Sequence, residues 1–221
     1  MKKWTSVEKA PTPDGKTISL DEHDGSYTIR VDGAPLMSTR QHESEDKLAE
    51  FGCAHLRGRR HARVLIGGLG LGFTLRAALA ALDEDASVVV AEILAEVIDW
   101  NRNPAYHLAA DDMADPRVVI VQQDVMLLIR SEKGGFDSIM LDVDNGPAAV
   151  STVGNDRLYE STGLRHVRAA LRPGGCAAYW SAAPDPPFQA LMTRAGFTVD
   201  VKNCRSRPNA GRWHAIYLGW V

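Results

Sequence analysis

The sequence predicts an α/β fold, in which a mostly parallel sheet of seven strands ends in an antiparallel hairpin and follows a small β appendage. Three observations support this prediction. From residue 63 onward, short apolar segments alternate with segments of helical periodicity, as in strands joined by helices. The last two apolar segments are separated by about ten residues, too few for a helical crossover. Residues 17–38 instead alternate polar and apolar side chains around turn signals.

The N-terminal segment reads as the appendage. Residues 1–13 carry Pro11 and Pro13 and are expected to form a loose arm. Three short strands are predicted over 17–20, 26–31 and 34–37. Ser44 is expected to cap a helix over 45–57. The predicted boundary gives an appendage of residues 1–45 and a main domain of residues 46–221.

The main domain is predicted to be Rossmann-like, with its elements taken in chain order from the apolar periodicity. Strands are expected over 63–66, 87–92, 117–121, 136–141, 176–181, 198–204 and 214–220. Helices are expected over 73–82, 94–101, 124–130, 155–171 and 188–195. The Pro173-Gly174-Gly175 sequence is expected to end the longest helix before the fifth strand.

Composition narrows the class of protein. A length of 221 residues suits one sizeable domain, and a net charge of -3 gives no electrostatic footprint for nucleic acid. No apolar run is long enough to predict a membrane span, and the start lacks the apolar core of a signal peptide. Three cysteines without metal-ligand spacing predict reduced thiols in the cytoplasm and no metal site. Trp213 and Trp220 near the C-terminus are compatible with a homodimer.

A glycine-rich turn follows the first strand of the main domain. Its glycines are Gly67, Gly68, Gly70 and Gly72. Glycines after an apolar strand allow bare backbone to approach a ligand that side chains would exclude. Phe73 and Thr74 follow the last glycine where a nucleoside-triphosphate loop needs a lysine, so this turn is not expected to bind ATP or GTP. The spacing is also one residue short of the nicotinamide-dinucleotide fingerprint.

Acidic and amide side chains follow the next three strands. Glu92 ends the second strand and is placed to bind the two hydroxyls of a ribose, although a solvated strand end is the alternative. Gln123 and Asp124 follow the third strand, where Asp124 can accept from an adenine amino group, cap its helix, or do both. Asp142 and Asp144 follow the fourth, as catalytic carboxylates or as turn-stabilising side chains. The carboxyl ends of parallel strands share one edge, so we expect these groups to converge on an adenosine-containing cofactor.

These strand ends, in this order, resemble the spermidine synthase-like (polyamine aminopropyltransferase) branch of the class I S-adenosylmethionine-dependent methyltransferase fold. Four segments carry the resemblance: 64–72 resembles the glycine-rich turn, Glu92 the ribose-binding glutamate, 123–125 the adenine-side segment, and 136–142 the fourth strand with its catalytic-loop aspartate. The resemblance implies S-adenosylmethionine or its decarboxylated form as cofactor, bound by the four glycines, Glu92, Gln123, Asp124 and Asp142. It implies Asp142 and Asp144 as catalytic residues.

The acceptor side matches this branch less well. The second acid, Asp144, comes one residue earlier than in that branch, and the Tyr-His pair of its substrate segment is absent. Gln41 matches that segment, and Trp180 at the end of the fifth strand is a candidate for the acceptor pocket. Aminopropyl transfer to a small-molecule amine is therefore the first hypothesis. Methyl transfer from S-adenosylmethionine, with Arg40 or His42 near the methionine carboxylate, and a non-catalytic cofactor-binding domain are the alternatives.

Overall fold

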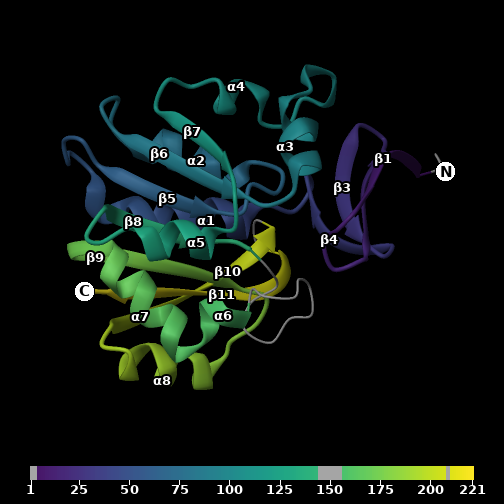
Figure 1. The fold of residues 1–221 in the computed structure, drawn as a ribbon. Coiled ribbons are helices and arrows are strands. Elements are labelled where there is room, and N and C mark those ends of the chain that lie inside the picture. Colours follow the sequence, from purple (N-terminus) through teal and green to yellow (C-terminus); the bar gives the residue numbers. More distant parts are fainter. Residues whose placement is uncertain (1–3, 144–155, 208–209) are drawn as a thin grey trace.

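The computed structural model describes residues 4–143, 156–207 and 210–221, which form two sheets with helices on both faces of the larger one (Figure 1). The larger sheet has the order β10-β11-β9-β8-β5-β6-β7. Its strands, in chain order, are β5 (Arg63–Gly67), β6 (Ser87–Glu92), β7 (Val118–Gln122), β8 (Phe136–Leu141), β9 (Leu171–Ser181), β10 (Thr198–Arg207) and β11 (Ala210–Trp220). The predicted class, seven strands with a C-terminal hairpin, is confirmed.

The order in which the chain adds parallel strands reverses next to β5, near the middle of this sheet. Strand β5 pairs in parallel with β6 on one side and with β8 on the other, so the chain steps outward to β7 and then returns to the far side of β5. Strand β11 is antiparallel to both β9 and β10. In open α/β sheets, ligands bind outside the carboxyl ends of the strands at such a switch point.

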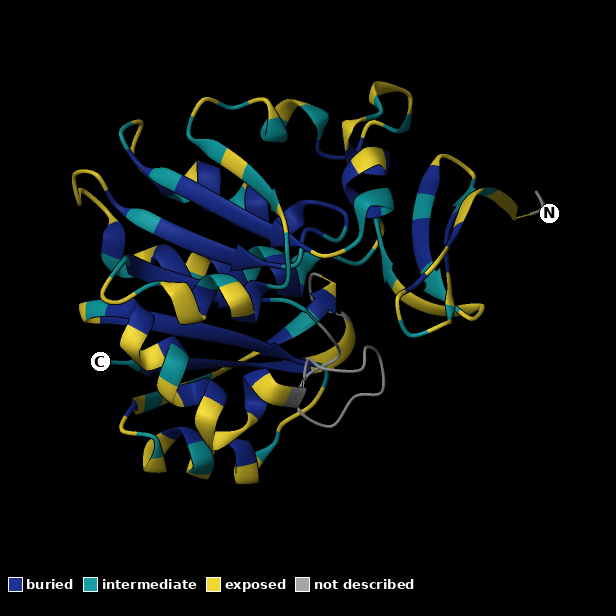
Figure 2. Ribbon diagram, in the orientation of Figure 1, coloured by how far each residue is buried: buried dark blue, intermediate teal, exposed yellow. Residues whose placement is uncertain are grey.

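Two hydrophobic cores lie on the two faces of the sheet, because successive side chains of a strand point to opposite sides. Val64 and Ile66 of β5 belong to one core and Leu65 to the other. The helices divide the same way: α1 (Glu43–Cys53), α2 (Phe73–Ala81) and α3 (Ala95–Arg102) cover the first face, and α5 (Val125–Ser131), α7 (Ser161–Ala170) and α8 (Pro186–Arg194) the second. Figure 2 shows the central strands almost wholly buried and the outer helix surfaces exposed.

The smaller sheet is antiparallel and stands at one end of the larger one (Figure 1). Its strands are β1 (Thr5–Pro11), β2 (Thr17–His23), β3 (Ser26–Val31) and β4 (Ala34–Ser38). The expectation of a loose arm over residues 1–13 was wrong, because β1 pairs with β2 from Thr5 to Pro11. As an edge strand it accommodates Pro11, whose missing N–H is not needed for pairing on its open side.

Three further predictions need correction. Ser44 does not cap α1: His42 takes that position, and Ser44 is buried inside the first turn. The single long helix is two helices, α6 (Asp156–Tyr159) and α7, because Glu160 between them is extended. Strand β9 begins at Leu171 and not at Cys176, so the Pro-Gly-Gly sequence is contained in the strand. Short helices at Ala54–Leu56, Pro104–Tyr106 and Ala110–Met113 were not predicted.

Candidate functional site

A cavity of about 1050 Å³ lies where the two sheets meet, outside the carboxyl ends of the parallel strands. The large sheet lines it with Gly68, Glu92 and Asp142, and the small sheet lines it with apolar side chains such as Ile18 and Ile29. The described ends of β5, β6, β8 and β9 and the segment after β7 therefore all reach one space, as the sequence predicts. Ligand pockets for drug-sized molecules are typically about 300–1,000 Å³, so this one can hold a nucleoside donor and a small acceptor together.

The glycine turn packs more closely against protein than the sequence suggests. Gly68 and Gly70 line the cavity, whereas Gly67 and Gly72 do not. Gly68, Gly70 and Gly72 all have positive φ, between 53° and 89°. A Cβ on Gly68 would collide with the carbonyl oxygen of Asp142, and one on Gly70 would lie 2.6 Å from the thioether of Met37. The glycines thus permit close packing of the turn against β8 and the small sheet, in addition to any approach of a ligand.

Glu92 ties the end of β6 to this turn. One carboxylate oxygen accepts the backbone N–H of Leu69 and the other that of Leu94, each at 2.9 Å. Burial raises the pKa of Glu92, and these backbone donors oppose that rise. The carboxylate also lines the cavity, and each oxygen can accept more than one hydrogen bond. Ribose binding by Glu92 stays a prediction, and a second role in holding the turn is now visible.

Asn101, which the sequence analysis missed, supports the turn from α3. Its side chain is fully buried, and its amide donates to the carbonyl oxygens of Gly70 and Val97, each at 2.8 Å. A hydrogen bond to a backbone carbonyl fixes the conformation of the turn without a charge. The only sequence signal is a polar residue among apolar positions of an amphipathic helix, which is too weak to identify the contact.

The segment after β7 forms the far wall of the cavity. Gln123 and Asp124 line it, together with the exposed apolar side chain of Ile93, which follows Glu92. Asp124 caps α5 by accepting the N–H of Met126 at 2.8 Å, and it pairs with Arg157 at 3.0 Å. The predicted cap is confirmed, and Asp124 also borders the cavity, while its contact with an adenine amino group stays a prediction. A flat apolar base is well suited to the surface beside Ile93.

Asp142 lines the cavity directly after β8. Its backbone N–H donates to the carbonyl oxygen of Gly67 at 2.9 Å, and its carboxylate accepts the hydroxyl of Thr74 at 3.1 Å. Burial raises the pKa of Asp142 to about 6, and the hydroxyl of Thr74 opposes the rise. A carboxylate with a pKa near neutrality is suited to accept a proton. Asp144, the second predicted catalytic acid, lies outside the described residues.

Glu45 is a second acid in the cavity that the sequence analysis did not assign. It lies in the first turn of α1 and is 6% exposed, and Ser44 donates a hydrogen bond of 2.5 Å to its carboxylate. Burial, followed by the negative field of Asp142, raises the pKa of Glu45 to about 7. An acid that follows a predicted capping serine looks like ordinary helix chemistry in sequence, which is why its burial was not foreseen.

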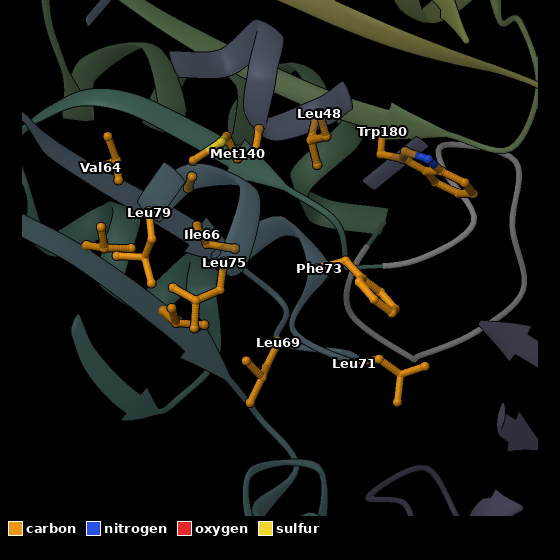
Figure 3. Close-up of a cluster of buried hydrophobic side chains, with 14 of the residues drawn as sticks. Leu48, Val64, Ile66, Leu69, Leu71, Phe73, Leu75, Leu79, Met140 and Trp180 are labelled. Atoms are coloured by element: carbon orange, nitrogen blue, oxygen red, sulfur yellow. The ribbon is translucent and has the colours of Figure 1, made fainter. Parts of the chain in front are cut away.

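The predicted acceptor residues also border this space. Gln41 and Trp180 line the cavity, and the indole of Trp180 stacks on His214 with ring centroids 4.9 Å apart. Trp180 packs into the core beside α1, at the end of the group of buried side chains in Figure 3. His42 instead stacks on Phe73 and pairs with Asp46. It does not line the large cavity, so the structure gives no support to its contact with a cofactor tail.

Different parts of the cavity wall offer different chemical groups. The ends of β5 and β6 and the segment after β7 provide backbone, an acid and an apolar surface, which suits a nucleoside. Asp142 and Glu45 both line the cavity and repel each other when both are ionised. Two such carboxyl groups attract cationic ligands. Among the described residues, no group of three or more His, Cys, Asp or Glu side chains could hold a metal ion.

Comparisons with known proteins agree with this geometry. No model of a protein family matches the chain. Polyamine aminopropyltransferases from two strains of Leptospira biflexa serovar Patoc are 30% identical over 169 residues, 76% of this chain and 50% of theirs. The chain therefore spans about half the length of the curated relatives it matches.

Solved structures share the fold. The spermidine synthase of Thermotoga maritima superposes with a TM-score of 0.77 at 20% identity, over 97% of this chain and 72% of that one. A spermidine synthase in complex with the transition-state analogue AdoDATO gives 0.76 at 19%, over the same shares. A probable spermidine synthase from Corynebacterium glutamicum gives 0.66 at 16%, over 100% of this chain and 81% of that one. Likeness at these identities shows the fold.

Proposed function

We propose that this chain, which is similar in sequence to polyamine aminopropyltransferases and shares its fold with spermidine synthases, transfers an aminopropyl group from decarboxylated S-adenosylmethionine to an amine. One observation carries the proposal. A half-buried acid, Asp142, lines the same cavity as the nucleoside-type wall and a second, interacting acid, Glu45. The residues fit the donor: Glu92 borders the space for a ribose, and the two acids suit a ligand with two positive charges.

The reaction needs positioning and one proton acceptor. The acceptor amine attacks the carbon next to the sulfonium, a C–N bond forms, and the C–S bond breaks with its electron pair staying on sulfur. The nitrogen loses one proton, and we assign that proton to the carboxylate of Asp142. Sulfur leaves as a neutral thioether, so the leaving group needs no acid. The protein's contribution is to align the two reactants and to keep Asp142 ionised.

The two acceptor candidates retain their proposed role. Gln41 of the segment before α1 and Trp180 of β9 both line the cavity. Trp180 lies on the side opposite the predicted nucleoside wall, because β9 and β6 lie on opposite sides of β5 and β8. We propose that they contact the acceptor amine. Asp144 is proposed as a second catalytic acid from the sequence alone.

Product analysis tests the proposed reaction. Purified protein is incubated with an amine, 1,4-diaminobutane first, and with either decarboxylated S-adenosylmethionine or S-adenosylmethionine. Methylthioadenosine and an aminopropylated amine are expected with the decarboxylated donor. Formation of S-adenosylhomocysteine would instead identify a methyltransferase. Cofactor binding without either product, across a panel of primary and secondary amines, would identify a non-catalytic cofactor-binding domain.

The cysteines bear on the cellular setting of the protein. The cysteines Cys53, Cys176 and Cys204 are all unpaired and buried, and burial raises each thiol pKa above its usual value. We propose that the protein acts in the reducing cytoplasm. No helix among the described residues is long and apolar enough to cross a membrane. A homodimer stays a prediction, and the 54% exposed Trp213 is a candidate for its contact.

A further inference from the structure

Most carboxylates of the cavity are already committed to protein partners. The described acidic residues that line it are Glu45, Glu92, Asp124, Asp142 and Asp185. Glu92 accepts two backbone N–H groups, and Asp124 caps α5 and pairs with Arg157. Asp185 caps α8 by accepting the N–H of Phe188. Glu45 and Asp142 instead accept hydroxyl hydrogen bonds, from Ser44 and Thr74, and the proposed reaction uses only Asp142.

Glu45 is buried without a cation. It is 6% exposed, and its hydrogen-bond donor is the hydroxyl of its chain neighbour Ser44. No arginine, lysine or histidine of the described residues forms an ion pair with it. The largest effect of a neighbouring charge on it comes from another acid, Asp142. A buried carboxylate in this state is costly unless a positive group joins it, so a cationic ligand group beside Glu45 would relieve the cost.

The proposed donor offers such a group. Decarboxylated S-adenosylmethionine carries an ammonium three methylene groups from its sulfonium, and it lacks the carboxylate of S-adenosylmethionine. A carboxylate brought to the same place would meet two acids instead of a positive partner. We propose that Glu45 binds the terminal ammonium of the donor and thereby selects the decarboxylated cofactor over S-adenosylmethionine. This inference rests on the proposed function and assigns a specificity-determining residue within it.

Binding without an acceptor tests the assignment. Isothermal calorimetry measures decarboxylated S-adenosylmethionine, S-adenosylmethionine and methylthioadenosine, which has no ammonium tail, against wild type and Glu45→Gln. The substitution is expected to weaken the decarboxylated donor by about 10- to 100-fold, as for loss of a charged hydrogen bond. Binding of methylthioadenosine should change by less than about twofold, which also reports that the variant is folded. The preference for decarboxylated S-adenosylmethionine over S-adenosylmethionine should therefore be smaller in the variant than in wild type.

Two further variants sharpen the test. Glu43→Gln removes an acid from the same turn of α1 that does not line the cavity, and it should leave all three affinities unchanged. Glu45→Asp keeps the charge on a shorter side chain and should show an intermediate loss. Together they separate the position of the charge from its mere presence on the helix.

The outcomes are distinguishable from those that test the reaction itself. Unchanged affinity of Glu45→Gln for the decarboxylated donor overturns the inference, as does an equal loss for all three ligands. An effect confined to the KM of the acceptor also overturns it, because Glu45 would then bind the amine. In each of these cases wild type still forms methylthioadenosine, and the proposed function stands. Wild type that binds S-adenosylmethionine and ignores the decarboxylated donor overturns both.

Discussion

The carboxylate of Glu92 accepts the backbone N–H of Leu69 at 2.9 Å, so the end of β6 holds the glycine turn that follows β5. The same carboxylate accepts the N–H of Leu94. This acid therefore links three consecutive parts of the site: a strand end, a turn and the start of α3. Any ribose that binds Glu92 would bind a group that is already fixed in position by backbone donors.

Glu92→Gln should cost both stability and ligand affinity. The amide offers one acceptor oxygen in place of two and sets its NH₂ against a backbone N–H. We expect a loss of about 1–3 kcal/mol in the free energy of unfolding, together with weaker binding of methylthioadenosine. Urea unfolding with and without the ligand measures both effects. Glu96→Gln, a neighbouring acid on α3 outside the cavity, is the control, and equal behaviour of the two variants would contradict this role.

Gly68→Ala should destabilise the protein more than an alanine at an open glycine. Gly68 has a φ of +89°, and its added Cβ would collide with the carbonyl oxygen of Asp142. Gly134 has a φ of +56° with nothing near its added Cβ, so Gly134→Ala isolates the cost of the backbone conformation. We expect about 1 kcal/mol for Gly134→Ala and clearly more for Gly68→Ala. Thermal unfolding of the two variants checks the order, and a reversed order would show that β8 yields to the methyl group.

Asp142→Asn is expected to abolish turnover while cofactor affinity stays within about tenfold of wild type. The amide keeps the shape and can still receive the hydroxyl hydrogen bond of Thr74, but it cannot take a proton from the amine. Rapid-quench product analysis measures turnover, and calorimetry measures affinity. Turnover at the wild-type rate would show that Asp142 takes no part in the reaction.

Thr74→Val, which removes only the hydroxyl partner of Asp142, should raise the pKa of Asp142 and slow turnover near neutral pH.

The pH dependence follows from the raised pKa values of Asp142, about 6, and Glu45, about 7. Catalysis needs Asp142 ionised, so turnover should fall as pH drops through about 6. The stability of the ligand-free protein should change in the opposite direction. Each acid has a higher pKa in the folded than in the unfolded chain, so its stabilising contribution is complete below the unfolded pKa and is lost as pH rises through the folded value.

Urea midpoints at about pH 5.5 and about pH 8 measure this loss. From the lower to the higher pH, the free energy of unfolding should fall further for wild type than for Glu45→Gln. The decarboxylated donor, which brings two positive charges, should restore wild type most at the higher pH. A difference between wild type and the variant that does not change with pH would contradict the burial of an ionisable Glu45.

Trp180→Phe should raise the KM of the acceptor and leave cofactor affinity unchanged. The ring can still stack on His214, while the side chain becomes smaller on the proposed acceptor side of the cavity. Stability should change by less than about 1.5 kcal/mol, because the indole Nε1 is buried and has no hydrogen-bond partner among the described residues. Steady-state kinetics with varied amine and with varied donor separates the two effects. A change in donor affinity alone would place Trp180 on the nucleoside side.

Sequence patterns predicted the large sheet well because its strands are apolar on both faces and its helices are amphipathic. Strands β6 and β8 were predicted with their observed limits, and the convergence of Gly68, Glu92 and Asp142 on one edge follows from parallel topology alone. Strand β1 was missed because it forms by pairing with β2, and its own sequence gave no strand pattern. Local pattern also could not place the break at Glu160, where two short helices replace one.

The sequence predicted the site residues that lie at strand ends, and it missed those that lie on helices. Glu45 was missed because its burial depends on how α1 packs against β9 and β10, two strands that lie far from α1 in the sequence. Asn101 was missed for a similar reason, since its carbonyl partner Gly70 comes from another element. The protein partners of the glycine turn, such as Met37, belong to a different sheet altogether.

The close approach of Met37 to Gly70 joins the two sheets at the very turn that would cradle the nucleoside. The cavity is therefore lined by both sheets, and neither sheet encloses it alone. Removing the residues before β5 would take away the cavity wall that Ile18, Ile29 and Met37 provide and would open this side of the cavity to water. The large sheet grafted alone into another scaffold would keep Glu92 and Asp142 at its strand ends but would lose this apolar wall.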